Sequence, residues 1–142
     1  MGRQFMKDIE LRILKRYNEL QNPTLEAATD QYSRFDAFNH KEIAEIKFRK
    51  IHYKITLIEF DKYAFNSMYG QVWNKDFLYI VGDPTGIYVF NVTLLNLENY
   101  DFLWGVEEMP STTERGKARP INKLVGYIEW ERCYQKFNST SK

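Results

Sequence analysis

The sequence is poor in the residues that build covalent cross-links and soft-metal sites. It contains one cysteine, Cys133, and two histidines, His40 and His52, among 142 residues. A single cysteine excludes an internal disulfide and a cysteine-based zinc cluster, and two histidines argue against a histidine-rich metal site. Any metal bound by this chain is therefore expected to be a hard cation held by carboxylates.

Long apolar runs and a strong net charge are also lacking. No segment is long enough to span a bilayer, and the first residues carry charge and show no apolar signal region. We therefore expect a cytoplasmic protein without a membrane partner. The formal net charge is +1, so a binding site for a polyanion must be a local basic patch and not a global field.

Apolar and aromatic residues, in contrast, are abundant. They make up 44% and 16% of the chain, which is typical of a globular protein and not of a disordered one. The length of 142 residues suits one domain with a sizeable core. No repeat, linker or composition shift divides the chain, so we expect residues 1–142 to form a single α/β domain.

Hydrophobic periodicity predicts a mixture of helices and strands. Apolar residues at helical spacing predict a helix over residues 5–21, and Thr56 with Glu59, spaced as a capping box, predicts a helix that ends at Gly70. A short terminal helix is expected at residues 131–137. Runs of β-branched and aromatic residues between turn signals predict the strands. The expected strands are residues 32–38, 43–49, 77–81, 87–92 and 124–130.

Glu45 and Lys47 are the pair that defines the candidate site. In a strand over residues 43–49 alternate side chains share a face, so the two stand side by side on the polar face while the opposite face enters the core. Asp36 precedes Glu45 with a gap of eight residues. It lies on the preceding strand and becomes a neighbour of Glu45 if the hairpin register places the two opposite each other.

Two carboxylates on adjacent strands suit a divalent cation such as Mg²⁺, which proteins commonly bind through one or two acids. Asp36 and Glu45 would be these acids, and the backbone carbonyl of Ile46 could be a third ligand. Water and a substrate phosphate would complete the shell, and such a metal polarises the phosphate and helps to generate hydroxide. Lys47 could orient the attacking water or stabilise the transition state electrostatically.

Two further side chains could reach the site from the flanking helices. Glu10 lies at the margin of the apolar stripe of the helix over residues 5–21. It could point inward or remain a solvated boundary residue. Lys62 lies near the start of the next predicted helix, where a functional lysine and a solvated surface lysine are equally compatible with the pattern.

The motif residues resemble those of a known family. Asp36, an eight-residue gap and Glu45-Ile46-Lys47 between apolar residues are similar to the motif of the PD-(D/E)xK nuclease superfamily, also called restriction-endonuclease-like. A helix with an acid before the motif, a helix with a lysine after it and a following strand hairpin fit the same order. The resemblance covers residues 5–92 and is to small phage and bacterial members. It implies an α/β fold in which helices flank a mixed central sheet.

This resemblance also implies roles for the site residues. Asp36 and Glu45 would hold Mg²⁺ or Mn²⁺, Lys47 would be the catalytic lysine, Glu10 the auxiliary acid and Lys62 the basic residue of the following helix. The implied activity is metal-dependent hydrolysis of phosphodiester bonds, with DNA as the expected substrate, in the cytoplasm of a bacterial or phage-infected cell. A homodimer is left open.

Other interpretations of the same residues stay open. Phe35 stands where the family has its name-giving proline, and the first core strand is expected to be short or missing between Pro23 and Gln31. The triplet could also be an amphipathic strand with an exposed ion pair between Glu45 and Lys47. A non-catalytic nucleic-acid-binding or assembly protein of the same fold is the alternative function, and an RNA-directed enzyme of the same chemistry is a third.

Basic residues follow the motif and recur late in the chain. They could contact phosphates, which binds nucleic acid without reading its sequence, and Tyr53 and Trp104 could line the same groove. Ordinary solvated charge is the other interpretation. The residues concerned are Lys47, Arg49, Lys50, His52, Lys54, Arg115, Lys117, Arg119 and Lys123.

Overall fold

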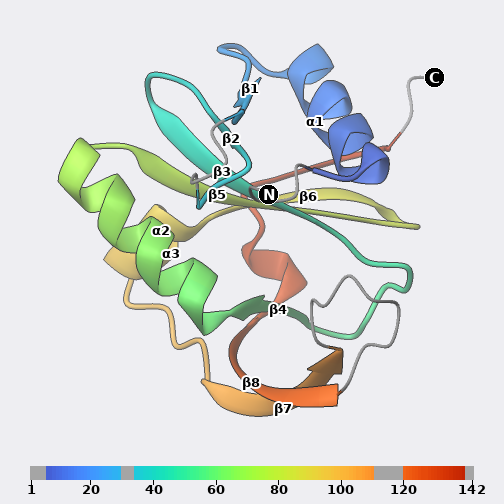
Figure 1. The fold of residues 1–142 in the computed structure, drawn as a ribbon, viewed down its shortest axis with the longest axis vertical. Helices are drawn as coiled ribbons and strands as arrows, with labels where there is room; N and C mark the ends of the chain where they lie inside the picture. The colour runs from blue at the N-terminus through green and yellow to red at the C-terminus, as the bar shows by residue number, and fades with distance from the viewer. Residues whose placement is uncertain (1–5, 30–33, 111–119, 140–142) are drawn as a thin grey trace.

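The computed structural model describes residues 6–29, 34–110 and 120–139, which adopt a mixed α/β fold with two β-sheets (Figure 1). The helices are α1 (Asp8–Leu20), α2 (Phe60–Trp73), α3 (Val92–Leu97) and the 3-10 turn η1 (Trp130–Arg132). The six-stranded sheet contains, in spatial order, β1 (Glu26–Ala27), β2 (Ala37–Phe38), β3 (Glu42–Phe48), β5 (Asp76–Asp83), β6 (Gly86–Asn91) and β9 (Gln135–Phe137). The three-stranded sheet contains β4 (Thr56–Glu59), β8 (Pro120–Ile128) and β7 (Gly105–Pro110).

The larger sheet is mixed in direction. Strands β1, β2 and β3 pair antiparallel, β3 and β5 pair in parallel, and β5, β6 and β9 pair antiparallel. Parallel neighbours need a crossover connection, and here it runs through β4 and α2. The strand with the candidate motif, β3, is therefore held between the β2 hairpin on one side and β5 on the other.

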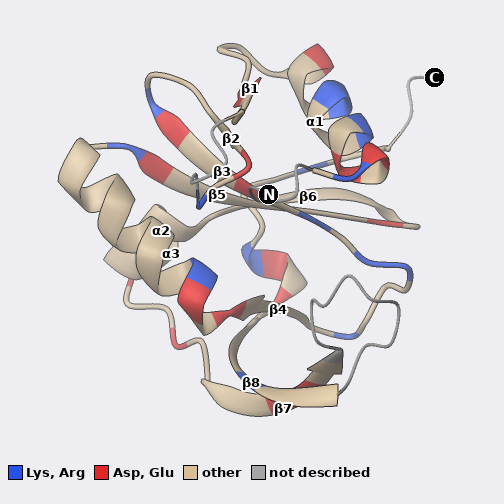
Figure 2. Ribbon diagram, viewed as in Figure 1, with Lys and Arg blue, Asp and Glu red and all other residues tan. Residues whose placement is uncertain are grey.

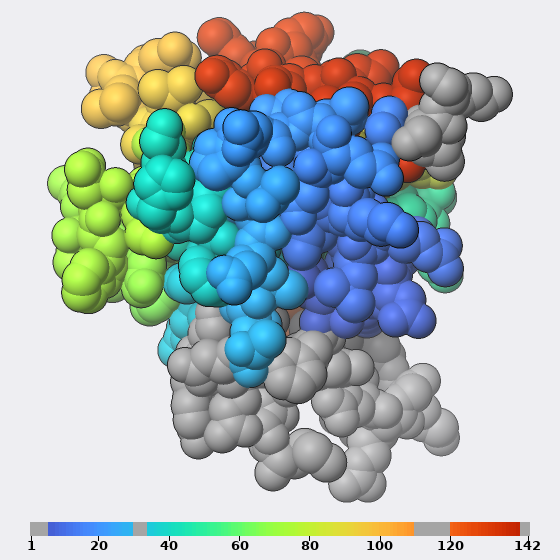
Figure 3. Space-filling view, turned by 90° about the horizontal axis from the view of Figure 1, so that it is seen from above, coloured from blue at the N-terminus to red at the C-terminus, as the bar shows by residue number. Residues whose placement is uncertain are grey.

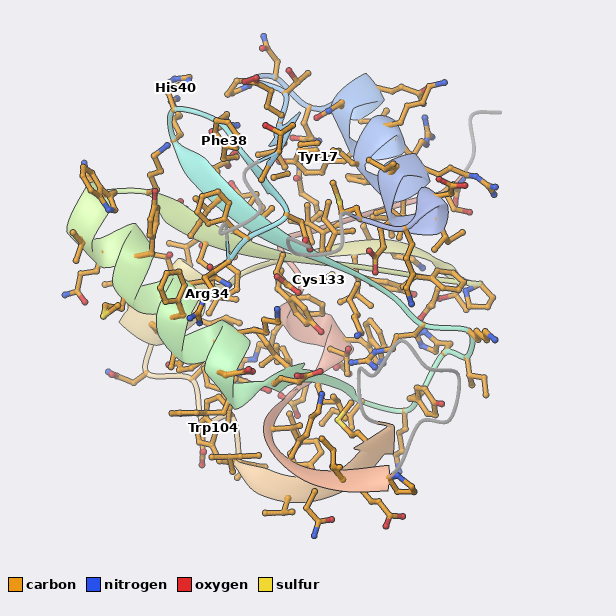
Figure 4. The ribbon with its side chains drawn as sticks, viewed as in Figure 1. Tyr17, Arg34, Phe38, His40, Trp104 and Cys133 are labelled. Carbon is orange, nitrogen blue, oxygen red and sulfur yellow. The ribbon has the colours of Figure 1, made fainter. Side chains whose placement is uncertain are left out.

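Both faces of the larger sheet are buried, which fixes β3 in position. Helix α1 covers one face, where Ile13 and Tyr17 pack with Ala44 and Ile46 of β3. Tyr17 points from α1 toward the sheet (Figure 4), and α1 with the residues after it spreads over this face in Figure 3. Helices α2 and α3 and the smaller sheet lie on the other side (Figure 1), over a second apolar cluster that includes Ile43.

The sequence predicted several elements correctly. The helix expected over residues 5–21 is α1 within the described residues, and the strand expected over 43–49 is β3. The strands expected over 77–81 and 87–92 are β5 and β6, which pair as a hairpin. The strand expected over 124–130 overlaps β8. Each of these elements has either a hydrophobic period or a run of apolar residues of its own, so local sequence was sufficient to place them.

The strands before the motif are short. The strand predicted over residues 32–38 is reduced, in the described part, to Ala37 and Phe38, and residues 32–33 lie outside the described residues. The first strand, β1, has two residues and pairs with β2, in line with the expectation that it is short or missing. The β2–β3 hairpin forms as expected, with Ala37 opposite Ala44 and Phe38 opposite Ile43.

The helix predicted to begin at Thr56 is wrong at its start. Thr56–Glu59 form strand β4, which pairs antiparallel with β8. Helix α2 begins at Phe60, and Glu59 is its N-cap residue without a side-chain capping bond. The capping-box spacing is a local signal, and pairing with a strand far along the chain overrides it.

The predicted end of this helix is also wrong. Helix α2 continues past Gly70 to Trp73 and is closed by Asn74, whose φ of 57° is left-handed. Gly70 is buried because the backbone carbonyl of Lys75 packs directly against its Cα, where a Cβ would collide. This glycine therefore allows a close approach of two backbones and does not end the helix.

The terminal helix predicted at residues 131–137 is wrong as well. Trp130–Arg132 form the short turn η1, and Gln135–Phe137 form β9, which pairs with β6 at the edge of the larger sheet. The free backbone edge of β6 provides hydrogen-bond partners that the local sequence does not reveal.

Candidate active site

A cavity of about 170 Å³ lies beside β3 and contains every side chain that the sequence predicted for the site. Helix α1, the bend before β2, strand β3 and the first turn of α2 each contribute to its wall. The predicted residues in the wall are Glu10, Asp36, Glu45, Ile46, Lys47 and Lys62. Four residues that sequence reasoning did not assign complete it, namely Arg49, Ile58, Glu59 and Tyr79.

The register of the β2–β3 hairpin brings Asp36 and Glu45 together. Because Ala37 pairs with Ala44, the ladder continued by one residue puts Asp36 opposite Glu45. The Asp36 N–H donates to the Ala44 carbonyl at 2.8 Å, and the Ile46 N–H donates to Asp36 Oδ2 at 2.9 Å. Asp36 lies in the bend just before β2 and not within a strand, but these two bonds hold its carboxylate against β3.

Glu45 is buried, although the sequence predicted a polar, solvent-facing side of β3. Its exposed fraction is 9%, and that of Asp36 is 7%. Tyr79 of β5 is its partner in the parallel register, and Ile58 of β4 closes the cavity from the smaller sheet. The interpretation of Glu45 as half of an exposed surface ion pair is therefore wrong.

Burial and the neighbouring Asp36 carboxylate raise the pKa of Glu45 from 4.5 to about 8. The positive charges of Lys62 and Lys47 lower the pKa of Glu45, but not enough to bring it back to 4.5. Two carboxylates facing each other in a low-dielectric cavity repel, and a cation between them would relieve that repulsion and allow both to ionise. The electrostatics of the cavity therefore favour a bound positive charge.

Glu10 reaches the cavity from the first turn of α1. Its Oε1 accepts the backbone N–H of Lys7, the N-cap residue of α1, at 3.2 Å, so the residue has a structural role that the sequence analysis missed. Burial raises the pKa of Glu10, the bond from Lys7 partly offsets this, and the Asp36 carboxylate adds a smaller upward effect. Of the two positions considered for Glu10, the structure shows the inward one.

Lys47 stands on the same side of β3 as Glu45 and lines the cavity. Burial, together with the Arg49 guanidinium, lowers the pKa of Lys47. Nearby carboxylates oppose this, and Glu59 has a larger effect than Glu45. An amine whose pKa is lowered can exchange a proton more readily near neutral pH than a solvated lysine can.

Lys62 and Glu59 bound the cavity at the start of α2, where Figure 2 shows basic and acidic segments side by side. Lys62 Nζ lies 3.9 Å from Glu45 Oε2, and its side chain is 43% exposed, so this contact is a weak one. Glu59, predicted as a capping residue, lines the cavity and pairs with Lys123 at 3.2 Å. Lys123 is therefore engaged in an ion pair and not in an open basic patch.

The donor set fits a hard divalent cation with few protein ligands. The residues that the structure describes contain no group of three or more His, Cys, Asp or Glu side chains placed to hold a metal ion. Asp36 and Glu45 remain as a buried pair of oxygen donors, and Mg²⁺ commonly binds through one or two carboxylates with water and phosphate as the other ligands. A contribution from the Ile46 carbonyl stays a prediction.

The basic patch predicted for nucleic acid is described only in part. Lys47 and Arg49 line the cavity, and Lys50, His52 and Lys54 are exposed in the loop after β3. The predicted residues Arg115, Lys117 and Arg119 lie outside the described residues.

The two aromatic residues predicted to line a nucleic-acid groove behave differently. Tyr53 is exposed in the loop after β3. Trp104 instead packs in an aromatic cluster with Phe60, Tyr63 and Phe102 below the start of α2 (Figure 4). Of the two, Tyr53 is thus the better placed to meet a ligand.

Three general observations complete the description. Among the described residues, no helix combines the length and the apolar character that crossing a bilayer requires. The chain matches no protein-family model, and a search of curated proteins also finds no match. A functional assignment therefore depends on the geometry of the cavity.

Proposed function

We propose that this protein is a metal-dependent nuclease that hydrolyses phosphodiester bonds in DNA. One observation carries the proposal. Glu10, Asp36, Glu45, Lys47 and Lys62, which were chosen from a sequence pattern, line a single cavity although they come from two helices, a strand and a bend. A chance Glu-x-Lys triplet on a surface strand would not bring these side chains together.

The order of elements supports a restriction-endonuclease-like core. Helix α1 carries an acid of the cavity and precedes β1, β2 and β3, which form an antiparallel meander with the motif at β2–β3. Helix α2, which carries a lysine of the cavity, follows and leads into β5, which is parallel to β3 and begins a hairpin. A helix with an acid before the motif, a helix with a lysine after it and a following strand hairpin are the order on which the resemblance to the PD-(D/E)xK superfamily is based, and this order supports the proposal.

The residues divide the chemistry between holding a metal and handling a proton. Asp36 and Glu45 would hold Mg²⁺ or Mn²⁺, which when bound polarises the phosphate and lowers the pKa of water. Lys47, half-buried beside the pair and with a lowered pKa, orients the attacking water and can exchange a proton with it. Lys62 and Arg49, at the wall of the same cavity, offset the charge that develops on the phosphate.

Plasmid cleavage tests this proposal directly. Supercoiled plasmid and circular single-stranded DNA are incubated with the protein and Mg²⁺ or Mn²⁺, with EDTA as the metal-free control. We expect the wild type to cut in a metal-dependent way, Asp36→Ala to be inactive and Lys47→Ala to cut far more slowly. Lys15→Ala removes an exposed lysine of α1 that is not part of the cavity wall and should retain activity. The ratio of nicked to linear plasmid shows whether two copies act together as a homodimer.

A non-catalytic nucleic-acid-binding or assembly protein is the second candidate. It is favoured by the finding that the described residues offer two facing carboxylates but no group of three metal-binding side chains. If wild type and Asp36→Ala both leave DNA intact but retard it on a gel, this second candidate is correct. Cleavage of RNA alone would instead assign the same chemistry to an RNA substrate.

A further inference from the structure

A second and larger cavity adjoins the candidate active site. It has a volume of about 510 Å³ and lies between the loop after β3 and the smaller sheet. Arg49 lines both this cavity and the one that holds Asp36 and Glu45. The two cavities therefore share one residue, Arg49, and a ligand bound at the first can extend past Arg49 into the second. We call the second cavity the side pocket.

Aromatic rings line the side pocket and are held in place. Tyr53, Tyr127 and Trp130 are part of its wall. The Trp130 Nε1–H donates to the Tyr53 backbone carbonyl at 2.8 Å, and the indole stacks on His52 with ring centroids 4.5 Å apart. The Tyr127 hydroxyl donates to Glu107. Tyr53 differs from the others because its side chain is 54% exposed, which leaves ring surface available to a ligand.

Charge in the side pocket is divided between its two walls. Arg49 and Lys54 lie on the loop after β3, whereas Glu107 and Glu108 lie on β7. Successive side chains of a strand point to opposite faces, and the Tyr127 hydroxyl donates to Glu107, so the carboxylate on the pocket side of β7 is that of Glu107. A free phosphate would meet this carboxylate as well as two cations and is therefore a poor match. A nucleoside fits better, because its phosphate can stay with Arg49 while an amino group of its base faces Glu107, which accepts such donors.

We propose that the side pocket holds the base of the nucleotide next to the phosphate at the active site, so that the protein acts on strands that are unpaired at the cut. The volume lies within the range of about 300–1,000 Å³ that is usual for small-ligand pockets. A base in a continuous duplex must leave its stack before it can enter such a pocket, whereas a single strand meets little of that cost. This inference rests on the proposed function, because the phosphate next to the base is the one at Asp36 and Glu45.

Binding measurements without metal isolate the side pocket from catalysis. Fluorescence anisotropy in EDTA is recorded with a labelled single-stranded DNA 12-mer, the same sequence as a duplex, and an abasic 12-mer that has only sugar and phosphate. Stacking of one base on an aromatic ring is worth about a 5- to 150-fold change in Kd. We expect Tyr53→Ala to weaken binding of the single strand by that factor and Tyr53→Trp to retain it.

The matched control is Tyr134→Ala, because Tyr134 is 61% exposed and is not part of the side-pocket wall; it should bind like the wild type. The abasic strand should bind weakly to the wild type and no more weakly to Tyr53→Ala. The duplex should bind more weakly than the single strand. Truncation of Tyr53 leaves its backbone carbonyl, and hence the bond to Trp130, in place.

Several results would overturn the side pocket as a base site. These are equal single-strand affinities of Tyr53→Ala and wild type, an abasic strand that binds as tightly as the normal one, and a duplex preferred over the single strand. Failure of the nuclease proposal looks different. Tyr53-dependent binding would then persist while plasmid and circular single-stranded DNA stay uncut with every metal.

Discussion

Replacing Glu45 by glutamine should make the metal-free protein more stable at high pH and leave it unchanged at low pH. In the wild type, Glu45 ionises near pH 4.5 when the chain is unfolded but keeps its proton to about pH 8 when folded. Between these values the folded state binds the extra proton, so the free energy of unfolding falls as pH rises through this window. Glutamine imitates the protonated acid and removes this dependence.

The size of the effect follows from the difference between the folded and unfolded pKa of Glu45. A tenfold change in an acid dissociation constant corresponds to about 1.36 kcal/mol, so the rise in pKa from 4.5 to about 8 makes full ionisation of Glu45 in the folded, metal-free protein cost roughly 5 kcal/mol. A small domain has a total stability of only about 5–15 kcal/mol. The wild type should therefore lose about a third or more of such a stability in EDTA above about pH 8, while Glu45→Gln keeps it.

Urea unfolding followed by tryptophan fluorescence measures this difference. In EDTA, the stability difference between Glu45→Gln and wild type should grow from less than about 1 kcal/mol near pH 5 to several kcal/mol near pH 9. Mg²⁺ should restore the stability of the wild type at high pH and have little effect on the stability of Glu45→Gln. Glu131→Gln is the control at an exposed position of η1, and its stability should depend on pH as that of the wild type does. A constant difference between Glu45→Gln and wild type across the pH range would refute the reasoning.

Three further variants test separate parts of the structure. Lys47→Ala should lower DNA cleavage by about 100- to 1,000-fold, the usual loss when one transition-state donor is removed, as measured on supercoiled plasmid. Asp36→Asn should lower the pKa of Glu45, because the Asp36 carboxylate is one of the causes that raise it; the pH-dependent loss of stability in EDTA should then shrink, and an unchanged loss would contradict the coupling. Gly70→Ala should destabilise the protein by about 1–3 kcal/mol in urea, although alanine favours helices, because its Cβ would meet a backbone carbonyl in the loop after α2. If the Gly70→Ala variant were more stable than the wild type, the backbone after α2 would have to move away from the new Cβ without a cost in stability.

The convergence of the candidate residues could be predicted from sequence because each one depends on a local pattern. The period of two placed Glu45 and Lys47 on one side of β3, and a short hairpin connection was enough to bring Asp36 opposite Glu45. The edge of an apolar helical stripe left Glu10 with two possible directions, inward or solvated, and only the resemblance gave it a role at the site. Each of these inferences uses residues that are close in sequence, where the spacing along a helix or strand determines the face to which a side chain points.

The burial of the site could not be predicted in the same way. Glu45 and Lys47 look like a solvated strand face, and only the packing of α2, β4 and β5 over that face shows that it is closed. Tyr79 enters the wall through the parallel pairing of β3 with β5, a contact across a crossover that no local pattern encodes. For the same reason Glu59 was interpreted as the last residue of a capping box with Thr56, whereas both lie in β4 and Glu59 lines the cavity.

The strand errors have a common physical cause. Thr56–Glu59 and Gln135–Phe137 are short segments that the local pattern assigned to helices, and each becomes a strand because a distant partner offers free backbone groups. Such pairing depends on the tertiary structure more than on the propensity of the segment. By contrast, β3, β5 and β6 are long and rich in apolar residues and could be assigned from the sequence.

The most direct test of the account is the position of a bound metal. Crystals of the protein grown with Mn²⁺ can be measured for the anomalous signal of the ion. The account predicts one Mn²⁺ in the cavity beside β3, contacted by the carboxylates of both Asp36 and Glu45. An ion bound elsewhere, or none in that cavity at saturating Mn²⁺ while both carboxylates stay in place, would contradict it.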